Sequence, residues 1–60
     1  MFNEYDVVVA DKKLSDQVTV GCVGAILLCF DNGDYEVEFI DDHGESIETL
    51  TVPEHDLKLK

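Results

Sequence analysis

The stretch CFDNGDYEVEF, residues 29–39, places an Asn-Gly dipeptide between an apolar run and a run in which acidic and apolar residues alternate. Asn-Gly between two strand-like runs predicts a hairpin, because a type I′ turn needs a positive φ at both central residues. With residues 32–33 as a two-residue loop, the apolar side chains fall on one face and Glu36 and Glu38 point outward, which supports this register. The predicted pairs are Phe30 with Tyr35, Leu28 with Val37 and Ile26 with Phe39.

Around this hairpin, β-branched or alternating runs predict strands at 5–10, 22–30, 34–40, 46–52 and 57–60. The mixed segment 11–21 predicts a long loop that Leu14, Val18 and Val20 hold against the body of the protein. PEHD at 53–56 predicts a tight turn or one turn of 3₁₀ helix. No window repeats with the 3.6-residue period of an amphipathic helix, so we expect an all-β meander of five short strands without an α-helix.

The loop at 41–45 contains Gly44, a natural site for a positive φ. The register that follows has two acidic side chains directly opposite each other, which is mildly destabilising. It also leaves Leu50 and Val52 out of phase with Ile47, so a bulge is expected here. The predicted pairs are Ile40 with Ser46, Phe39 with Ile47 and Glu38 with Glu48.

The chain of 60 residues is long enough for one domain at most, and we expect residues 1–60 to form it. A flat open sheet of this size would leave one face bare and two long edges exposed. A small, strongly bent five-stranded SH3-like barrel avoids both problems. The sequence therefore predicts this fold class.

The net charge is −10, with 14 acidic residues against four lysines and no arginine. A phosphate backbone would be repelled by such a surface, which argues against nucleic-acid binding. A basic partner protein or a hard cation remains compatible with it. No apolar run approaches the roughly 20 residues that span a bilayer, and MFNEYD lacks the layout of a signal peptide. We therefore expect a cytoplasmic protein, complete as given, with no membrane partner.

Cys22 and Cys29 fall seven residues apart within one predicted strand. An extended chain separates them by about 23 Å, far beyond the reach of a disulfide. We expect no internal disulfide and no two-cysteine metal site, and we expect both side chains to behave as small buried hydrophobes.

Metal and catalytic sites find little support. Residues 31–34 lack the ligand spacing of a calcium loop and are explained as turn formers. Asp41, Asp42 and Glu45 form a weak candidate cation site at a loop tip, against the simpler interpretation of a solvated hairpin loop. His43 and His55 are not spaced as a zinc pair. No serine stands in a nucleophile-elbow context, and a barrel this small is filled by side chains, so we expect no enzyme and no cofactor.

The outward-facing positions of the second strand are the best functional clue, because Val23, Ala25, Leu27 and Cys29 are all apolar. The strand can bend at Gly24 and serve both halves of a barrel, with the 11–21 loop as its cover. Alternatively, a partner or a second copy of the chain covers it, together with Leu50 and Val52. Both interpretations stay open.

Residues 20–59 carry a further signal, because the chain contains a G-x-x-G-x-[IV] strand, then YEVEF-x-D-x-x-G-x-[ST] and a Leu-rich end. It thereby resembles a small bacterial family of unknown function, numbered 4926. Ala25 departs from the Thr that is usual before the Val or Ile. The resemblance implies an SH3-like barrel and no activity, and it implies small cytoplasmic proteins encoded beside other small, partly toxin-like proteins. The matching positions are Gly21, Gly24, Ile26, Tyr35, Glu36, Val37, Glu38, Phe39, Asp41, Gly44 and Ser46.

Two functional hypotheses follow. In the first, the protein is a non-enzymatic acidic module that docks or neutralises a basic partner, such as a toxin or nuclease, as an antitoxin or immunity protein would. In the second, it is a structural protein that self-associates, for example as a homodimer across its apolar outer face. The residues expected to bind a partner are Val23, Ala25, Leu27, Glu36, Glu38, Glu48 and Leu50.

Overall fold

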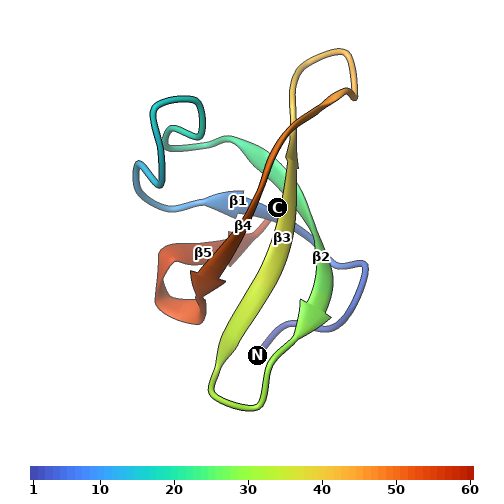
Figure 1. The fold of residues 1–60 in the computed structure, drawn as a ribbon, viewed down its shortest axis with the longest axis vertical. Helices are drawn as coiled ribbons and strands as arrows, with labels where there is room; N and C mark the ends of the chain where they lie inside the picture. The colour runs from blue at the N-terminus through green and yellow to red at the C-terminus, as the bar shows by residue number, and fades with distance from the viewer.

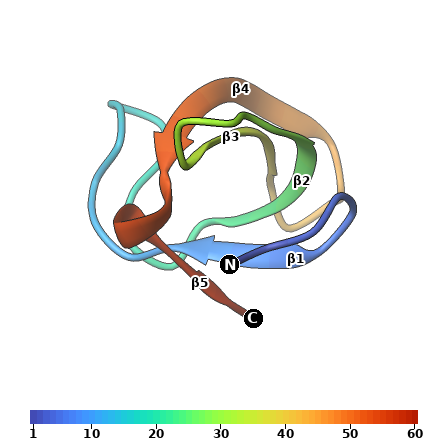
Figure 2. The same cartoon turned by 90° about the horizontal axis from the view of Figure 1, so that it is seen from below.

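A computed structural model describes residues 1–60 and shows one antiparallel sheet with the strand order β4-β3-β2-β1-β5. The sheet curls on itself, with β1 running between β2 and β5 (Figures 1 and 2). This confirms the all-β fold of five antiparallel strands in a small barrel-like arrangement, with a lone 3₁₀ turn. The elements are β1 (Val7–Ala10), β2 (Val23–Cys29), β3 (Asp34–Ile40), β4 (Ser46–Pro53), η1 (Glu54–Asp56) and β5 (Leu57–Leu59).

The core lies inside the curled sheet. Strand residues alternate between the two faces of a sheet, so every second residue of β1 and β3 points inward. Ile26 and Phe39 are among the largest side chains that are fully buried. The core residues are Phe2, Val8, Ala10, Val18, Ile26, Tyr35, Val37, Phe39, Val52 and Leu57.

The hairpin between β2 and β3 differs from the prediction. Its loop has three residues, because the Phe30 N–H donates to the Asp34 carbonyl at 2.9 Å and the Gly33 N–H donates to the Phe30 carbonyl at 3.2 Å. Gly33 has a positive φ of 91°, but Asn32 does not. Instead, the Asn32 side-chain oxygen accepts the Asp34 N–H at 3.1 Å. The predicted two-residue type I′ turn and its pairs are therefore wrong.

A bulge at Leu27 shifts the register of β2 once more, so Leu28 faces Glu36 while Ile26 faces Val37. Ile26 keeps its predicted place in the core. Leu28 and Phe30, which were expected there, are 47% and 42% exposed. The prediction was wrong for these two because the turn and the bulge each add one residue that the alternation of β3 does not reveal.

Gly24 of β2 lies opposite Phe39. A Cβ at this position would point into the core, 2.7 Å from Val37 Cγ1 and 2.9 Å from the Phe39 ring. The strand therefore needs glycine here because the space above it is filled by Phe39 and Val37.

The hairpin between β3 and β4 confirms the pair of Ile40 with Ser46, the bulge and the positive φ of Gly44, which is 83°. Ile47 is the bulged residue, so Phe39 faces Glu48 and Glu38 faces Thr49. The predicted pairs of Phe39 with Ile47 and Glu38 with Glu48 are wrong, and no like-charged pair results. The bulge returns Leu50 and Val52 to the inner face.

The long segment between β1 and β2 is held to the body mainly by Val18, which is fully buried, and by half-buried Leu14. The Ser15 hydroxyl accepts the Val18 N–H at 3.1 Å and donates to Glu48 Oε1 at 2.7 Å. Val20, expected to hold the loop down, is 66% exposed, and that prediction is wrong. None of the helical structure is long and apolar enough to cross a membrane.

Candidate functional site

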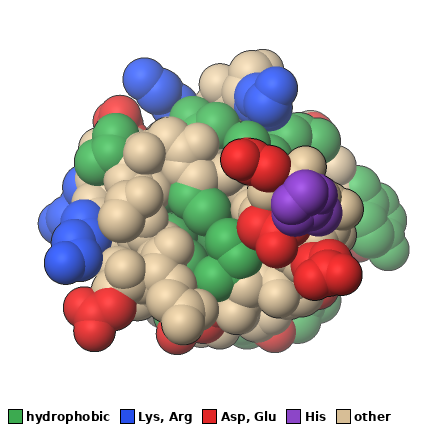
Figure 3. All heavy atoms as spheres, turned by 90° about the horizontal axis from the view of Figure 1, so that it is seen from above, with side chains coloured by type: hydrophobic (Ala, Val, Ile, Leu, Met, Phe, Trp, Pro, Cys, Tyr) green, Lys and Arg blue, Asp and Glu red, His purple; other side chains and the backbone are tan.

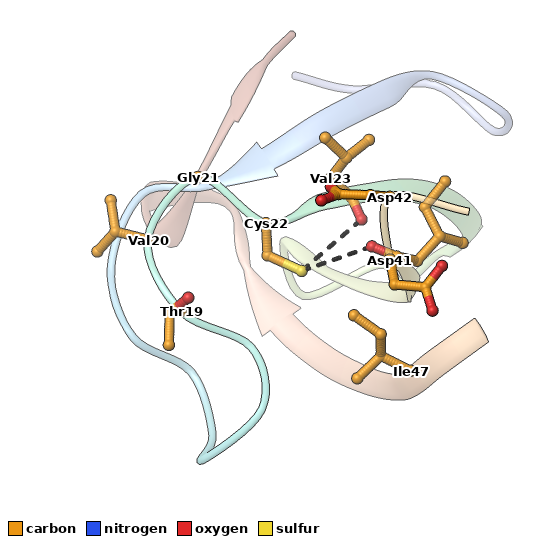
Figure 4. A pocket seen from close by; sticks show the side chains of 9 residues that line it. Thr19, Val20, Gly21, Cys22, Val23, Asp41, Asp42 and Ile47 are labelled. Carbon is orange, nitrogen blue, oxygen red and sulfur yellow. Dashed lines mark hydrogen bonds between the residues drawn. The ribbon is translucent and has the colours of Figure 1, made fainter. Parts of the chain in front are cut away.

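A depression of about 380 Å³ opens at one end of the barrel, between the segment that enters β2 and the β3–β4 hairpin. Figure 3 looks onto this end, where hydrophobic side chains are exposed in the middle and acidic side chains with a histidine gather on one side. In Figure 4, Thr19 and Val20 lie on one side of Cys22 and Asp41 lies on the other. The lining residues are Thr19, Val20, Gly21, Cys22, Val23, Ile40, Asp41, Asp42 and Ile47.

A second depression of about 410 Å³ adjoins the first at Ile47. Ser15, Asp16, Gln17 and Glu48 complete its lining. We call the two depressions together the acidic groove. Because Ile47 is the bulged residue of β4, the irregularity in that strand places an apolar side chain between the two halves.

Four carboxylates line the acidic groove, and no lysine lines it. Asp41 is fixed, because its Oδ1 accepts the N–H groups of His43 at 2.8 Å and Glu45 at 3.0 Å. At the opposite end of the groove, Asp16 lies 3.9 Å from the ammonium of Lys13. Asp42 is exposed and increases the negative field beside the apolar floor.

Cys22 lies half-buried on the floor of the groove, and its thiol is 3.8 Å from the Ile40 carbonyl and 4.0 Å from the Val23 carbonyl. Burial, with a smaller contribution from the negative charge of Asp42, raises the pKa of the Cys22 thiol. The thiol is therefore held in its protonated, less nucleophilic form. Cys29 is exposed, so the prediction that both cysteines are buried is wrong; neither forms a disulfide.

No group of three or more histidine, cysteine or acidic side chains comes together in a way that could hold a metal ion. Among the candidate ligands at 41–45, Asp41 already serves the backbone of its own loop. The residues at 31–34 act as turn formers, with the Asn32 side-chain amide donating to Asp34 Oδ2 at 3.3 Å.

The residues predicted to bind a partner do not form one surface. Glu48 and Val23 line the acidic groove, whereas Ala25 lies beside Glu38 on the outer face of the sheet. Leu50 packs against the core. Leu27 on β2 and Glu36 on β3 are half-buried and line neither depression.

The groove itself was missed. Asp16, Val20 and Asp42 lie in two loops, and loop residues carry no periodic signal from which their proximity could be predicted. The net charge of −10 was the one available indication that a surface feature of this chain would be acidic.

A second polar cluster lies at the opposite end of the barrel. The Tyr35 hydroxyl accepts the Phe2 N–H at 3.1 Å and donates to Glu54 Oε1 at 2.9 Å, and the ammonium of Met1 lies 2.8 Å from Glu54 Oε2. The rings of Phe2 and Tyr35 pack edge to face with centroids 5.3 Å apart. This cluster joins the first residues to η1 and is explained by stability alone.

The fold and the groove define a small all-β barrel with an acidic surface depression. The model of a family described as a domain of unknown function (DUF4926) matches residues 4–59. The chain therefore belongs to this family, which confirms the resemblance seen in its motifs. No curated protein and no solved structure matches the chain.

Proposed function

We propose that the protein is a non-enzymatic module that binds a basic partner protein at the acidic groove. The observation that carries this proposal is the composition of the groove, in which an apolar floor around Ile47 is bordered by four carboxylates and by no lysine. A buried apolar contact supplies affinity, and the surrounding charge selects the partner and speeds its approach.

The chemistry of the groove describes its partner. Val20, 66% exposed, offers an apolar contact on one side of Cys22, and Asp42 offers a carboxylate on the other side (Figure 4). A lysine or arginine beside an exposed apolar side chain on the partner would satisfy both. We propose a basic toxin or nuclease of the bacterial cytoplasm as this partner, which the protein would neutralise by covering that surface.

The polar groups in the groove support binding better than catalysis. The thiol of Cys22 has a raised pKa and is therefore a poor nucleophile at neutral pH. The Ser15 hydroxyl is held between Val18 and Glu48, and no histidine contacts it. Asp41 is engaged by its own loop.

The test compares three immobilised proteins: the native chain, Asp42→Lys and Asp31→Lys. Both aspartates are exposed hairpin-loop residues, and Asp31 lies in the loop outside the groove, so the two variants change the net charge equally. Each is incubated with extract of the native host at low ionic strength, and retained proteins are identified by mass spectrometry and eluted with salt.

We expect one basic protein to be retained in stoichiometric amount by the native chain and by Asp31→Lys, to elute as salt screens the charges, and to be lost with Asp42→Lys. Equal loss of the retained protein with both variants would show that the net charge of the chain, and not the groove, attracts it. Equal retention by all three proteins would show that the partner does not bind at the groove.

A further inference from the structure

The outer face of β1 and β2 carries four apolar side chains, Val7, Val9, Val23 and Ala25, which we call the outer stripe. Their direction follows from their neighbours, because Val8 and Ala10 are fully buried and the Cβ direction of Gly24 points into the core. The register places Val7 beside Ala25 and Val9 beside Val23. Val7 is 47% exposed and the other three are half-buried.

Opposite charges border the outer stripe on its two sides. On β5, Lys58 pairs with Val9, and the Lys60 N–H donates to the Val7 carbonyl at 3.1 Å. On β3, Glu38 pairs with Ala25. Two of the chain's four lysines therefore lie at one border of the stripe, while Glu38 lies at the other, where Ile40 also borders Val23.

We infer that the outer stripe is the contact surface of a symmetric homodimer. A two-fold axis parallel to the strands and between β1 and β2 places the stripe of one copy on the stripe of the other. The same rotation sets β5 of each copy over β3 of its partner, since β5 follows β1 and β3 follows β2 in the strand order. Lys60 of one copy then meets Glu38 of the other, and the contact occurs twice, as the symmetry of such an interface requires.

The arrangement of charge selects a second copy as the occupant. A surface of a single charge sign would fit a partner of opposite sign, whereas a stripe with positive and negative borders is complementary to itself. The borders are about 14 Å apart, from three strand spacings, so one copy covers both. Lys58 also lies 3.7 Å from Asp11 within its own chain, but an exposed pair of this kind is weak and does not prevent a new contact.

Light scattering during size-exclusion chromatography tests the proposal. The native chain is expected to elute at twice its mass of 6.7 kDa, and Val7→Lys is expected to elute as a monomer with an unchanged circular dichroism spectrum. Thr51→Lys is the control, since it places the same charge at an exposed position of β4, away from both the stripe and the groove, and leaves the dimer intact. A native chain that stays monomeric up to about 1 mM, or a dimer that survives Val7→Lys, overturns the proposal.

An exchange of charges tests the geometry of the dimer. Glu38→Lys and Lys60→Glu each place like charges opposite each other and are expected to raise the dissociation constant at least tenfold. The double variant restores the attraction and brings the dissociation constant back to within about threefold of the native value. Additive losses in the double variant would show that these two side chains do not meet.

Discussion

The phenol of Tyr35 donates a hydrogen bond to Glu54 at 2.9 Å while it accepts one from the Phe2 backbone at 3.1 Å. One hydroxyl thus connects the strand β3, the turn before β5 and the first residues of the chain. Because Tyr35 is only 4% exposed, water cannot readily replace either bond.

Tyr35→Phe is therefore expected to lower the free energy of unfolding by about 1–3 kcal/mol, since it leaves a buried N–H without its acceptor. Urea unfolding followed by circular dichroism measures the change. Tyr5→Phe is the control: Tyr5 is 77% exposed, and loss of its hydroxyl should leave the midpoint in place. Equal midpoints for both variants would mean that the Tyr35 hydroxyl contributes nothing.

Glu54 makes the stability contributed by this cluster depend on pH. Its pKa lies below the ordinary value because the hydrogen bond from the chain's ammonium group and then that from Tyr35 stabilise the carboxylate. A carboxyl group with a lower pKa in the folded state adds stability above its unfolded pKa of about 4.3 and loses it as the pH falls through the folded value.

The native chain should accordingly be more stable than Glu54→Gln at pH 7, and the difference should shrink as the pH falls below about 4. Urea midpoints of the two proteins across pH 2–7 measure it. Comparing the two cancels the effect of the other acidic residues. A difference that does not depend on pH would show that the charge of Glu54 is not what matters.

Gly24→Ala is expected to destabilise the barrel by about 1–3 kcal/mol through overpacking, because the added methyl group meets Val37 and Phe39 within 3 Å. Gly33→Ala is expected to cost about 1 kcal/mol through backbone strain, since Gly33 has a positive φ and open space around it.

Asparagine separates these two causes, because it tolerates a positive φ but is larger than alanine. Gly33→Asn should recover most of the loss, whereas Gly24→Asn should be worse than Gly24→Ala. Thermal or urea unfolding of the four variants decides the matter. Recovery at position 24 would contradict the close packing described there.

The register of β2 predicts opposite outcomes for two neighbouring apolar residues. Ile26→Ala is expected to cost about 2–5 kcal/mol, because it removes a fully buried side chain. Leu28→Ser is expected to cost about 1 kcal/mol, because Leu28 is 47% exposed. Similar losses for the two would favour the register without a bulge.

The two thiols should differ in reactivity. Iodoacetamide is expected to modify exposed Cys29 before Cys22, whose pKa is raised by burial and then by Asp42. Asp42→Asn should speed the reaction at Cys22 and leave Cys29 unchanged. Peptide mass spectrometry over a time course from pH 7 to pH 9 measures both rates, and equal rates in the native chain would contradict the half-buried position of Cys22.

The strands were predictable because Tyr35, Val37 and Phe39 alternate with acidic residues, and a period of two identifies the buried face of a strand. The exact partners of β2 were not predictable. Leu28 and Phe30 are as apolar as Ile26, and only the three-residue turn and the bulge at Leu27 decide which of them enters the core. Apolar character alone does not distinguish a strand of uniform composition from the same strand shifted by one residue.

The candidate site was less predictable than the fold. The acidic groove depends on Ile47 being the bulged residue and on the segment at 19–22 lying next to the β3–β4 hairpin. These contacts join residues far apart in the sequence that have no common pattern. Val23 and Ala25 on the outer face of β2 were predicted from alternation, whereas the bulge at Leu27 breaks the alternation before Cys29, which pairs with buried Tyr35. The lysines of β5 beside this face became apparent only from the strand order.

The position of β1 between β2 and β5 also bears on how the chain folds. The strands β2, β3 and β4 are joined by short hairpins and can pair while the rest of the chain is still unstructured. The pairing of residues 8–10 with residues 57–59 must instead close a loop of nearly the whole chain, which costs more chain entropy than closing a short hairpin. We expect the three-stranded meander to form first, and the sheet to be completed only after the last strand has left the ribosome.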